Sequence, residues 1–129
     1  MLFRSQGNAI AQNNLGAVYA NGQGVAKDYT QARAWLQMAA DQGDADAQYN
    51  LGVLYKNGWG VAKDYAQARA WLQKAADQGD ADAQYNLGVL YLNGQGVAKD
   101  YAQARAWLQR AADQGDADAI ESLKESPRP

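Results

Sequence analysis

Apolar residues in the segment 45–57 recur at helical spacing. Successive steps of about 100° per residue place four of them within one arc of about 100°, the width expected of a single buried helix face. Asp44 precedes the segment in an N-cap position, and Gly58 follows it where a left-handed turn would end a helix. The pattern predicts a helix, called helix A, over residues 45–57, with these residues buried: Ala47, Leu51, Leu54 and Tyr55.

A second helical pattern, called helix B, begins after Asp64. With Gln67, Asp64 forms an Asp-x-x-Gln arrangement close to a capping box, and Gly79 closes the pattern. The apolar positions of helix B fill a wider arc of about 140°, which suits contact with both the partner helix and the next unit. No part of the sequence has the alternation expected of a β-strand. The buried residues of helix B are predicted to be Tyr65, Ala68, Trp71, Leu72, Ala75 and Ala76.

The pair of helices occurs three times in the sequence, with a period of 36 residues. Residues 45–80 match residues 81–116 at 33 of 36 positions, and residues 9–44 match residues 45–80 at 28 of 36. A unit of this size cannot bury its apolar face alone and must stack on its neighbours. We therefore predict one repeat domain over residues 1–129: the remnant of a preceding repeat at 1–8, repeats at 9–44, 45–80 and 81–116, a C-terminal capping helix at 117–126 and a tail at 127–129.

Glycine recurs inside helix A, at Gly16, Gly52 and Gly88. Glycine in a helix interior costs about 1 kcal/mol relative to alanine. Its repetition there predicts that another helix approaches too closely for a side chain.

The spacing of small, aromatic and capping residues resembles the Sel1-like repeat (SLR), a relative of the tetratricopeptide repeat. This resemblance implies an all-α fold, a right-handed superhelical α-solenoid of antiparallel helix pairs whose A helices line a concave surface. It also implies an adaptor or scaffold, in bacteria often one that serves signalling, the envelope or host interaction. Some cysteine-rich relatives are described as β-lactamases or penicillin-binding proteins, but this chain lacks cysteine. In residues 45–80 the resemblance rests on Ala47, Leu51, Gly52, Tyr55, Gly58, Gly60, Val61, Asp64, Ala68, Trp71, Ala75, Ala76 and Gly79, and the same set recurs in the other two repeats.

The face of helix A opposite its buried arc is the candidate binding surface. Repeats 1 and 2 differ at all four positions of this face, whereas the scaffold positions hardly change. A row of Tyr, Val and Leu would form an amphipathic groove for an extended peptide or a helix. The alternative is that these positions are solvated and unconstrained, with the tyrosines packing on adjacent helices. The candidate partner-binding residues are Asp46, Tyr49, Val53 and Lys56 in repeat 2, and Asp82, Tyr85, Val89 and Leu92 in repeat 3.

Trp59 is a candidate contact anchor, because glutamine stands at the same place in the other repeats, at Gln23 and Gln95. A tryptophan in a turn is the kind of side chain that anchors a partner. The alternative is that it covers a neighbouring loop.

Composition argues against several kinds of chemistry. The 12 Lys and Arg residues against 14 Asp and Glu give a net charge of -2, with the signs interspersed, so no nucleic-acid partner is expected. With no histidine and no cysteine, a Ser-His-Asp site and the usual zinc sites cannot form. The paired aspartates stand at helix starts, where capping explains them. We expect no enzyme, catalytic residue, metal or cofactor.

The sequence favours a non-enzymatic adaptor that binds a protein or peptide segment along the concave face. The alternative is a structural or self-associating array, including a consensus-like designed scaffold. No apolar run approaches the roughly 18 residues that a membrane span requires, so membrane insertion is not expected. The sequence leaves the compartment, cytoplasmic or periplasmic, undecided.

Overall fold

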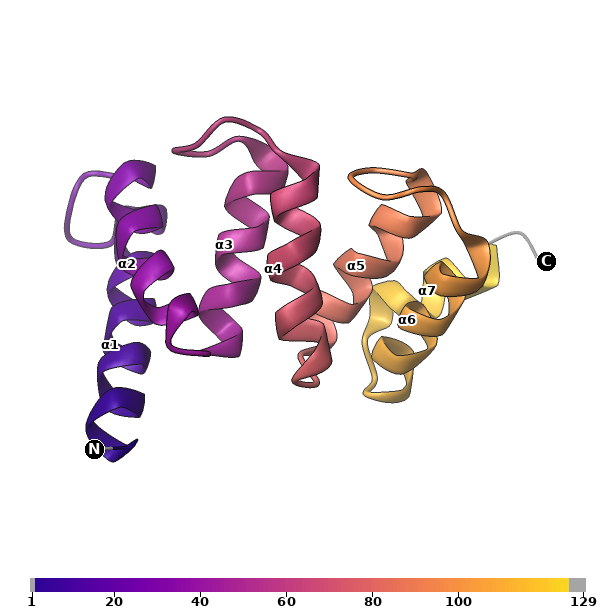
Figure 1. Ribbon diagram of the computed structural model, residues 1–129, viewed down its shortest axis with the longest axis horizontal. Coiled ribbons are helices and arrows are strands. Elements are labelled where there is room, and N and C mark those ends of the chain that lie inside the picture. Colours follow the sequence, from indigo (N-terminus) through magenta and orange to yellow (C-terminus); the bar gives the residue numbers. More distant parts are fainter. Residues whose placement is uncertain (1, 126–129) are drawn as a thin grey trace.

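A computed structural model of the protein describes the backbone of residues 2–125 and the side chains from Asn8 to Glu125. Within this part of the chain every regular element is a helix, as predicted, and the predicted tail at 127–129 lies outside it. The seven helices of this part of the chain run in order along the long axis of the molecule, with α1 and α7 at opposite ends (Figure 1). They are α1 (Leu2–Asn21), α2 (Tyr29–Asp41), α3 (Ala45–Asn57), α4 (Tyr65–Asp77), α5 (Ala81–Asn93), α6 (Tyr101–Asp113) and α7 (Ala117–Glu125).

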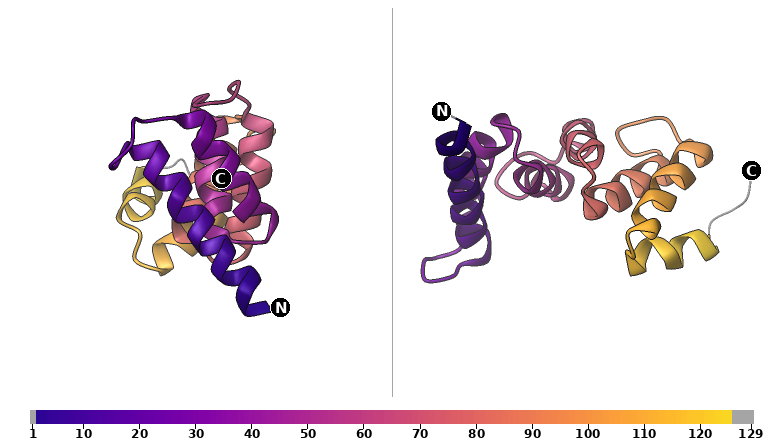
Figure 2. Two further views of the ribbon diagram at one scale, coloured as in Figure 1. Left: turned by 90° about the vertical axis from the view of Figure 1, so that its left-hand side faces the viewer. Right: turned by 90° about the horizontal axis from the view of Figure 1, so that it is seen from below.

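Each helix packs mainly on the helix before it and the helix after it, which makes the molecule a helical solenoid. Helices α1 and α2, α3 and α4, and α5 and α6 form the three helix pairs, and α7 packs on α6. Successive pairs turn relative to one another along the axis (Figure 2). The predicted three pairs and final helix are therefore confirmed.

The helix ends are set by the residues predicted to cap them. The Asp44 carboxylate accepts a hydrogen bond of 2.9 Å from the backbone N–H of Ala47, and Asp64 accepts one of 3.0 Å from that of Gln67. Gly58 ends α3 with a left-handed φ of 70°. These caps satisfy backbone groups that a helix end would otherwise leave unpaired.

The core is shared between repeats rather than enclosed within one. One cluster joins residues of α4, α5 and α6 across the boundary between repeats 2 and 3. Another joins Ala9 of α1 with residues of α2 and α3. Each repeat thus borrows apolar cover from its neighbours. The largest fully buried side chains are all leucines: Leu36, Leu51, Leu72, Leu87, Leu90 and Leu108.

The glycines inside helix A lie where the two helices of a pair come closest. A Cβ atom built on Gly88 would lie 2.9 Å from Leu108 Cγ, and one on Gly52 would lie 2.8 Å from Leu72 Cγ. Real Cβ atoms essentially never show contacts shorter than 3.0 Å. The predicted close approach is confirmed, and it explains why an unfavourable helix residue is kept in every repeat.

The two ends of the solenoid differ from its middle. Helix α1 is continuous from Leu2 to Asn21, so residues 2–7 run straight into the first helix A without the turn that Gln42 and Gly43 make in the next repeat. These few residues are too short to form a packed helix B of their own, and continuing α1 satisfies their backbone hydrogen bonds. At the other end, α7 ends at Glu125, and Ser126, the last residue of the predicted capping helix, lies outside the described residues.

Leu15 on α1 is 36% exposed, whereas the corresponding Leu51 and Leu87 are fully buried. The difference arises because no helix B covers that side of α1 among the described residues. Within residues 2–125, none of the helices combines the length and the apolar character needed to cross a lipid bilayer.

Candidate functional site

Helices α3 and α5 carry the eight residues predicted to bind a partner, in the same register because the repeats are 36 residues apart. The two aspartates, Asp46 and Asp82, are exposed in the first turns of their helices. The other six side chains are half-buried, so each of them contacts the scaffold and also reaches the surface. Those six are Tyr49, Val53, Lys56, Tyr85, Val89 and Leu92.

The two tyrosines also contribute to packing. Tyr49 packs against the cluster formed by α4, α5 and α6. Tyr85 packs in the same way against the cluster formed by α6 and α7. The sideways packing that was the alternative interpretation is therefore present, and each tyrosine is partly structural.

An acidic environment surrounds Tyr49. Burial raises the pKa of Tyr49 above its ordinary value of 10.0, and the carboxylates of Asp82 and Asp80 add to the rise. The phenol therefore stays protonated at neutral pH, where its hydroxyl can donate a hydrogen bond. Burial also raises the pKa of Asp80, and repulsion from Asp82 and Asp46 acts in the same direction.

The aspartates at the helix starts act as caps. Asp80 accepts a hydrogen bond of 3.1 Å from the backbone N–H of Ala83, and Asp116 accepts one of 2.9 Å from that of Ala119. Among the described residues, no three acidic side chains are grouped closely enough to hold a metal ion. The first aspartate of each pair is therefore an N-cap, whereas the second, Asp46, Asp82 or Asp118, is exposed in the first turn.

Lys56 crosses from one repeat to the next. Its ammonium donates a hydrogen bond of 3.0 Å to Asn86 Oδ1 on α5, while Asn86 Nδ2 donates to the carbonyl oxygen of Asp82 at 2.8 Å. This bridge spans the boundary between repeats 2 and 3. We call that boundary the second junction. The boundary between repeats 1 and 2 is the first junction.

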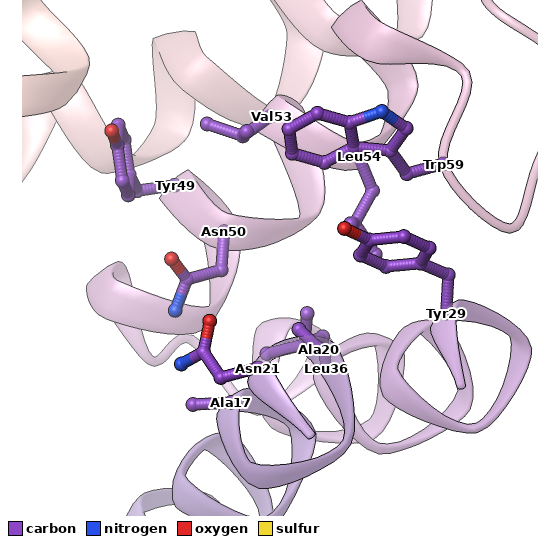
Figure 3. A pocket seen from close by; sticks show the side chains of 10 residues that line it. All are labelled: Ala17, Ala20, Asn21, Tyr29, Leu36, Tyr49, Asn50, Val53, Leu54 and Trp59. Atoms are coloured by element: carbon purple, nitrogen blue, oxygen red, sulfur yellow. The ribbon is translucent and has the colours of Figure 1, made fainter. Parts of the chain in front are cut away.

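At the first junction, three of the predicted residues meet in one pocket of about 230 Å³. Trp59 and Tyr29 stand on one side, Tyr49 on the other, and two asparagine carboxamides lie between them (Figure 3). None of the residues that line the pocket is charged. The lining residues are Ala17, Ala20 and Asn21 of α1, Tyr29 and Leu36 of α2, Tyr49, Asn50, Val53 and Leu54 of α3, and Trp59 of the α3–α4 loop.

Trp59 reaches the pocket because its loop is held against α2. Gly60 has a φ of 74°, and a Cβ atom there would lie 2.6 Å from the backbone carbon and oxygen of Tyr29. This close approach places Trp59, the residue before Gly60, over the Tyr29 ring. The Trp59 and Tyr29 rings stack with their centroids 5.3 Å apart and an interplanar angle of 18°. Trp59 thus covers the first residue of α2 rather than a neighbouring loop, and its side chain stays 42% exposed.

The second junction has bulkier residues at the same places. Lys56 stands where the first junction has Ala20, Val53 where it has Ala17, and Gln95 where it has Trp59. Small side chains on α1 leave the space, and the indole of Trp59 supplies a wall. Three substitutions between repeats therefore distinguish the two junctions.

Sequence reasoning brought Tyr49, Val53 and Trp59 to the pocket but missed several of its other walls. The helical pattern places Tyr65, the counterpart of Tyr29, on the core face of helix B, and it gives no signal for Asn21 or Asn50. Asn50 follows Tyr49 directly and could have been found from that position. The contribution of Tyr29 depends on how the loop folds back, which the spacing of residues along one helix does not reveal. The remaining predicted residues, Asp46, Lys56, Asp82, Tyr85, Val89 and Leu92, do not line this pocket.

The chain matches the family model described as Sel1 repeat at residues 9–44, 45–80 and 81–116. These bounds coincide with the three repeats predicted from the period. None of the curated proteins matches the chain.

Among solved structures, the chain is similar to c5321, described as a protective antigen present in uropathogenic Escherichia coli strains displaying an SLR fold. The identity is 43% and the TM-score 0.89, over 92% of this chain and 25% of that one. A Sel1 repeat protein from Oxalobacter formigenes is 41% identical with a TM-score of 0.86, over 90% of this chain and 48% of that one. This chain thus spans about a quarter and about half the length of those two proteins.

A third similar structure is the Helicobacter pylori cysteine rich protein B. It is 29% identical with a TM-score of 0.70, over 74% of this chain and 72% of that one. The helical repeat is therefore shared with a cysteine-rich protein, although this chain contains no cysteine.

Proposed function

We propose a function from the premise that the chain belongs to the Sel1 repeat family. Proteins of this family are typically scaffolds for protein–protein interaction and generally not enzymes. The proposed function is a non-enzymatic adaptor whose A helices hold a protein or peptide segment along one face. The observation that carries this proposal is the row of six half-buried side chains on α3 and α5, which the scaffold contacts but does not enclose.

The chemistry of the row suits a peptide. Tyr and Val side chains offer apolar contact, and the tyrosine hydroxyls offer hydrogen bonds. Asp46 and Asp82 add exposed carboxylates beside the tyrosines, one helical turn away on the same helices. A segment with alternating apolar and basic side chains would complement this surface.

Selection of a random peptide library against the 129-residue chain tests the proposal. The double variant Val89→Ala/Leu92→Ala gives the third repeat the alanines that the first repeat has at Ala17 and Ala20, so it is expected to fold. Peptides selected by the parent chain should bind this variant about ten-fold more weakly, because two apolar contacts are lost. The Tyr49→Ala/Tyr85→Ala variant should lose more binding, provided that circular dichroism shows unchanged helicity.

Gln67→Ala/Gln103→Ala is the matched control, since both side chains are exposed on the B helices. It should bind the selected peptides as the parent chain does. Equal binding by the parent chain and both A-helix variants would assign the contact to another surface.

Self-association is the second candidate function, and the exposed apolar residues at the two ends of the solenoid favour it. Leu15 and Ile10 on α1 are 36% and 56% exposed, and Ile120 on α7 is 40% exposed. If copies of the chain stack end to end, light scattering should show a mass that climbs with concentration, and Leu15→Glu should prevent the rise. A constant monomer mass across concentrations would remove this candidate.

A further inference from the structure

We propose that the pocket at the first junction is an anchor site for one aromatic side chain of a peptide that carries basic residues beside it. This inference rests on the proposed adaptor function and names the chemistry of the partner. The second junction, which has the same scaffold but different residues at three places, serves as its internal reference.

The size of the pocket limits what it holds. Drug-sized ligands occupy pockets of roughly 300–1,000 Å³. At about 230 Å³ the first-junction pocket is smaller, which fits a single large side chain rather than a cofactor. It is open to the surface where Trp59 is exposed, so a side chain can enter while its main chain stays outside.

The walls favour an aromatic ring. Three aromatic side chains from three different elements face the space: Tyr29 at the start of α2, Tyr49 in α3 and Trp59 in the following loop (Figure 3). Leu36 and Leu54 supply an apolar base. Aromatic pairs in stacked or edge-to-face contact contribute about 0.5–1.5 kcal/mol beyond the area that they bury, and aliphatic side chains do not gain this contribution.

Two carboxamides in the lining match a peptide main chain. Asn50 Nδ2 donates to Asn13 Oδ1 at 3.0 Å, which orients the Asn50 side chain. Among the described residues Asn21 has no hydrogen-bond partner for its side chain, and its carboxamide lines the pocket. A carboxamide both donates and accepts, so it can pair with the N–H or C=O of a bound segment.

The charge next to the pocket favours a basic flank. Asp46 lies one helical turn before Tyr49 on α3, and Asp82 occupies the same place on α5; both are exposed. No basic side chain lines the pocket: the ammonium of Lys56 is engaged with Asn86, and that of Lys27 lies over the Tyr29 ring, 5.6 Å from its centroid. A Lys or Arg next to the buried ring would find carboxylates, whereas a Glu would be repelled.

The experiment titrates the 129-residue chain with blocked tripeptides and follows backbone ¹H–¹⁵N shifts. The probes are acetyl-Lys-Phe-Lys-amide, acetyl-Lys-Ala-Lys-amide, which lacks the ring, and acetyl-Glu-Phe-Glu-amide, which reverses the charge. The Lys-Phe-Lys probe should bind with a Kd on the order of 1 mM and shift residues around the pocket, as expected for so small a ligand. The other two probes should bind at least ten-fold more weakly.

Two variants copy the second junction into the first. Ala20→Lys introduces the side chain that stands at Lys56, and Trp59→Gln introduces the residue that stands at Gln95, so neither is foreign to the fold. Each should weaken the Lys-Phe-Lys probe at least ten-fold. The reverse double variant, Lys56→Ala/Gln95→Trp, should create a second binding event at the second junction. A matched control is Ala102→Lys, at an exposed position of α6.

The outcomes separate the pocket from the adaptor function. Equal binding of the Phe and Ala probes, or unchanged binding to Ala20→Lys and Trp59→Gln, would overturn the anchor site while peptides from the library selection still bind elsewhere on the A helices. Loss of the Lys-Phe-Lys probe in both variants supports the anchor site, even when no library peptide is recovered. If no library peptide is recovered while the Lys-Phe-Lys probe still binds at the pocket, the proposed adaptor function is rejected and the anchor site is retained.

Discussion

The first and second junctions are built from nearly the same residues, yet they present different surfaces. At the first, Ala17 and Ala20 leave a neutral pocket that Trp59 walls on one side. At the second, Lys56 crosses to Asn86, and burial, with added repulsion from Asp82 and Asp46, raises the pKa of Asp80. The N-caps Asp44 and Asp80 and the buried leucines Leu36 and Leu72 recur at the two junctions.

The difference teaches how a repeat protein acquires a site. The scaffold residues are constrained by packing against the neighbouring repeats, so they recur with little change. The outward positions of helix A and the middle of its loop are not constrained in this way. A few substitutions there change size and charge without disturbing the stacking.

The largest expected difference between the junctions concerns their buried leucines. Leu72→Ala should lower the free energy of unfolding by about 2–5 kcal/mol, because Leu72 of α4 is fully buried, against Gly52 of α3 and in the cluster that α4 forms with α5 and α6. Leu36→Ala should cost less, near 2 kcal/mol, because Leu36 borders a pocket that is already open and the space left behind joins it. Urea unfolding of both variants measures the difference. Equal losses would mean that the pocket is closed in solution.

The next prediction concerns what the two junctions share. Gly88→Leu should destabilise the array by about 1–3 kcal/mol through overpacking, since a side chain there would strike Leu108 and the carbonyl oxygen of Ala104. Gly52→Leu should cost a similar amount, because its contacts with Leu72 and Ala68 have the same geometry. Thermal unfolding measures both. Ala102→Leu, which adds the same bulk at an exposed position, should leave the melting temperature unchanged.

Most of the fold could be predicted because it depends on local rules that every repeat obeys. The bounds of α3, residues 45–57, follow from Asp44, the helical spacing of Leu51 and Leu54, and Gly58, all of which act within one helix. The repetition then predicts the other two helix pairs, since any feature found in one repeat can be checked in the two others. Even the close approach of α6 to Gly88 could be predicted, because glycine destabilises a helix interior and yet recurs at this position in every repeat.

The pocket could be predicted only in part. The angular positions of Tyr49 and Val53 on helix A put them on the correct face, but the space beside them is created by what Ala17 and Ala20 lack. Its other wall depends on a loop that returns to a helix about 30 residues earlier, through the approach of Gly60 to Tyr29. Helical spacing carries no information on either point.

A smaller effect is expected from the aromatic stack that only the first junction has. Trp59→Gln should lower stability by about 1 kcal/mol, because the contact with Tyr29 is lost while the backbone of the loop fits glutamine equally well. The comparison variant Gln95→Trp should raise stability by a similar amount, provided that the new indole stacks on Tyr65 as Trp59 stacks on Tyr29. Chemical denaturation of the pair tests this. No change in either variant would show that the stack is not held in solution.

The smallest effect concerns the acidic character of the second junction. Because burial and repulsion raise the pKa of Asp80 in the folded chain, folding favours its protonated form. The stability linked to that proton is present below the unfolded pKa, near 3.8, and is lost as the pH rises through the folded pKa. Asp80→Asn keeps an oxygen that accepts from Ala83 and removes the charge. At pH 7 it should therefore be about 0.3 kcal/mol more stable than the parent chain, a modest gain because Asp80 is partly solvated.

At pH 3, where the carboxyl group of the parent chain is itself protonated, the two chains should unfold at the same urea concentration. Asp100→Asn, at the exposed N-cap of α6, controls for the loss of a charge at a helix start. A gain at pH 7 that persists undiminished at pH 3 would assign the effect to capping geometry instead of charge. The first junction has Ile10 where the second has Asp46, so the repulsion that Asp46 exerts on Asp80 has no counterpart there.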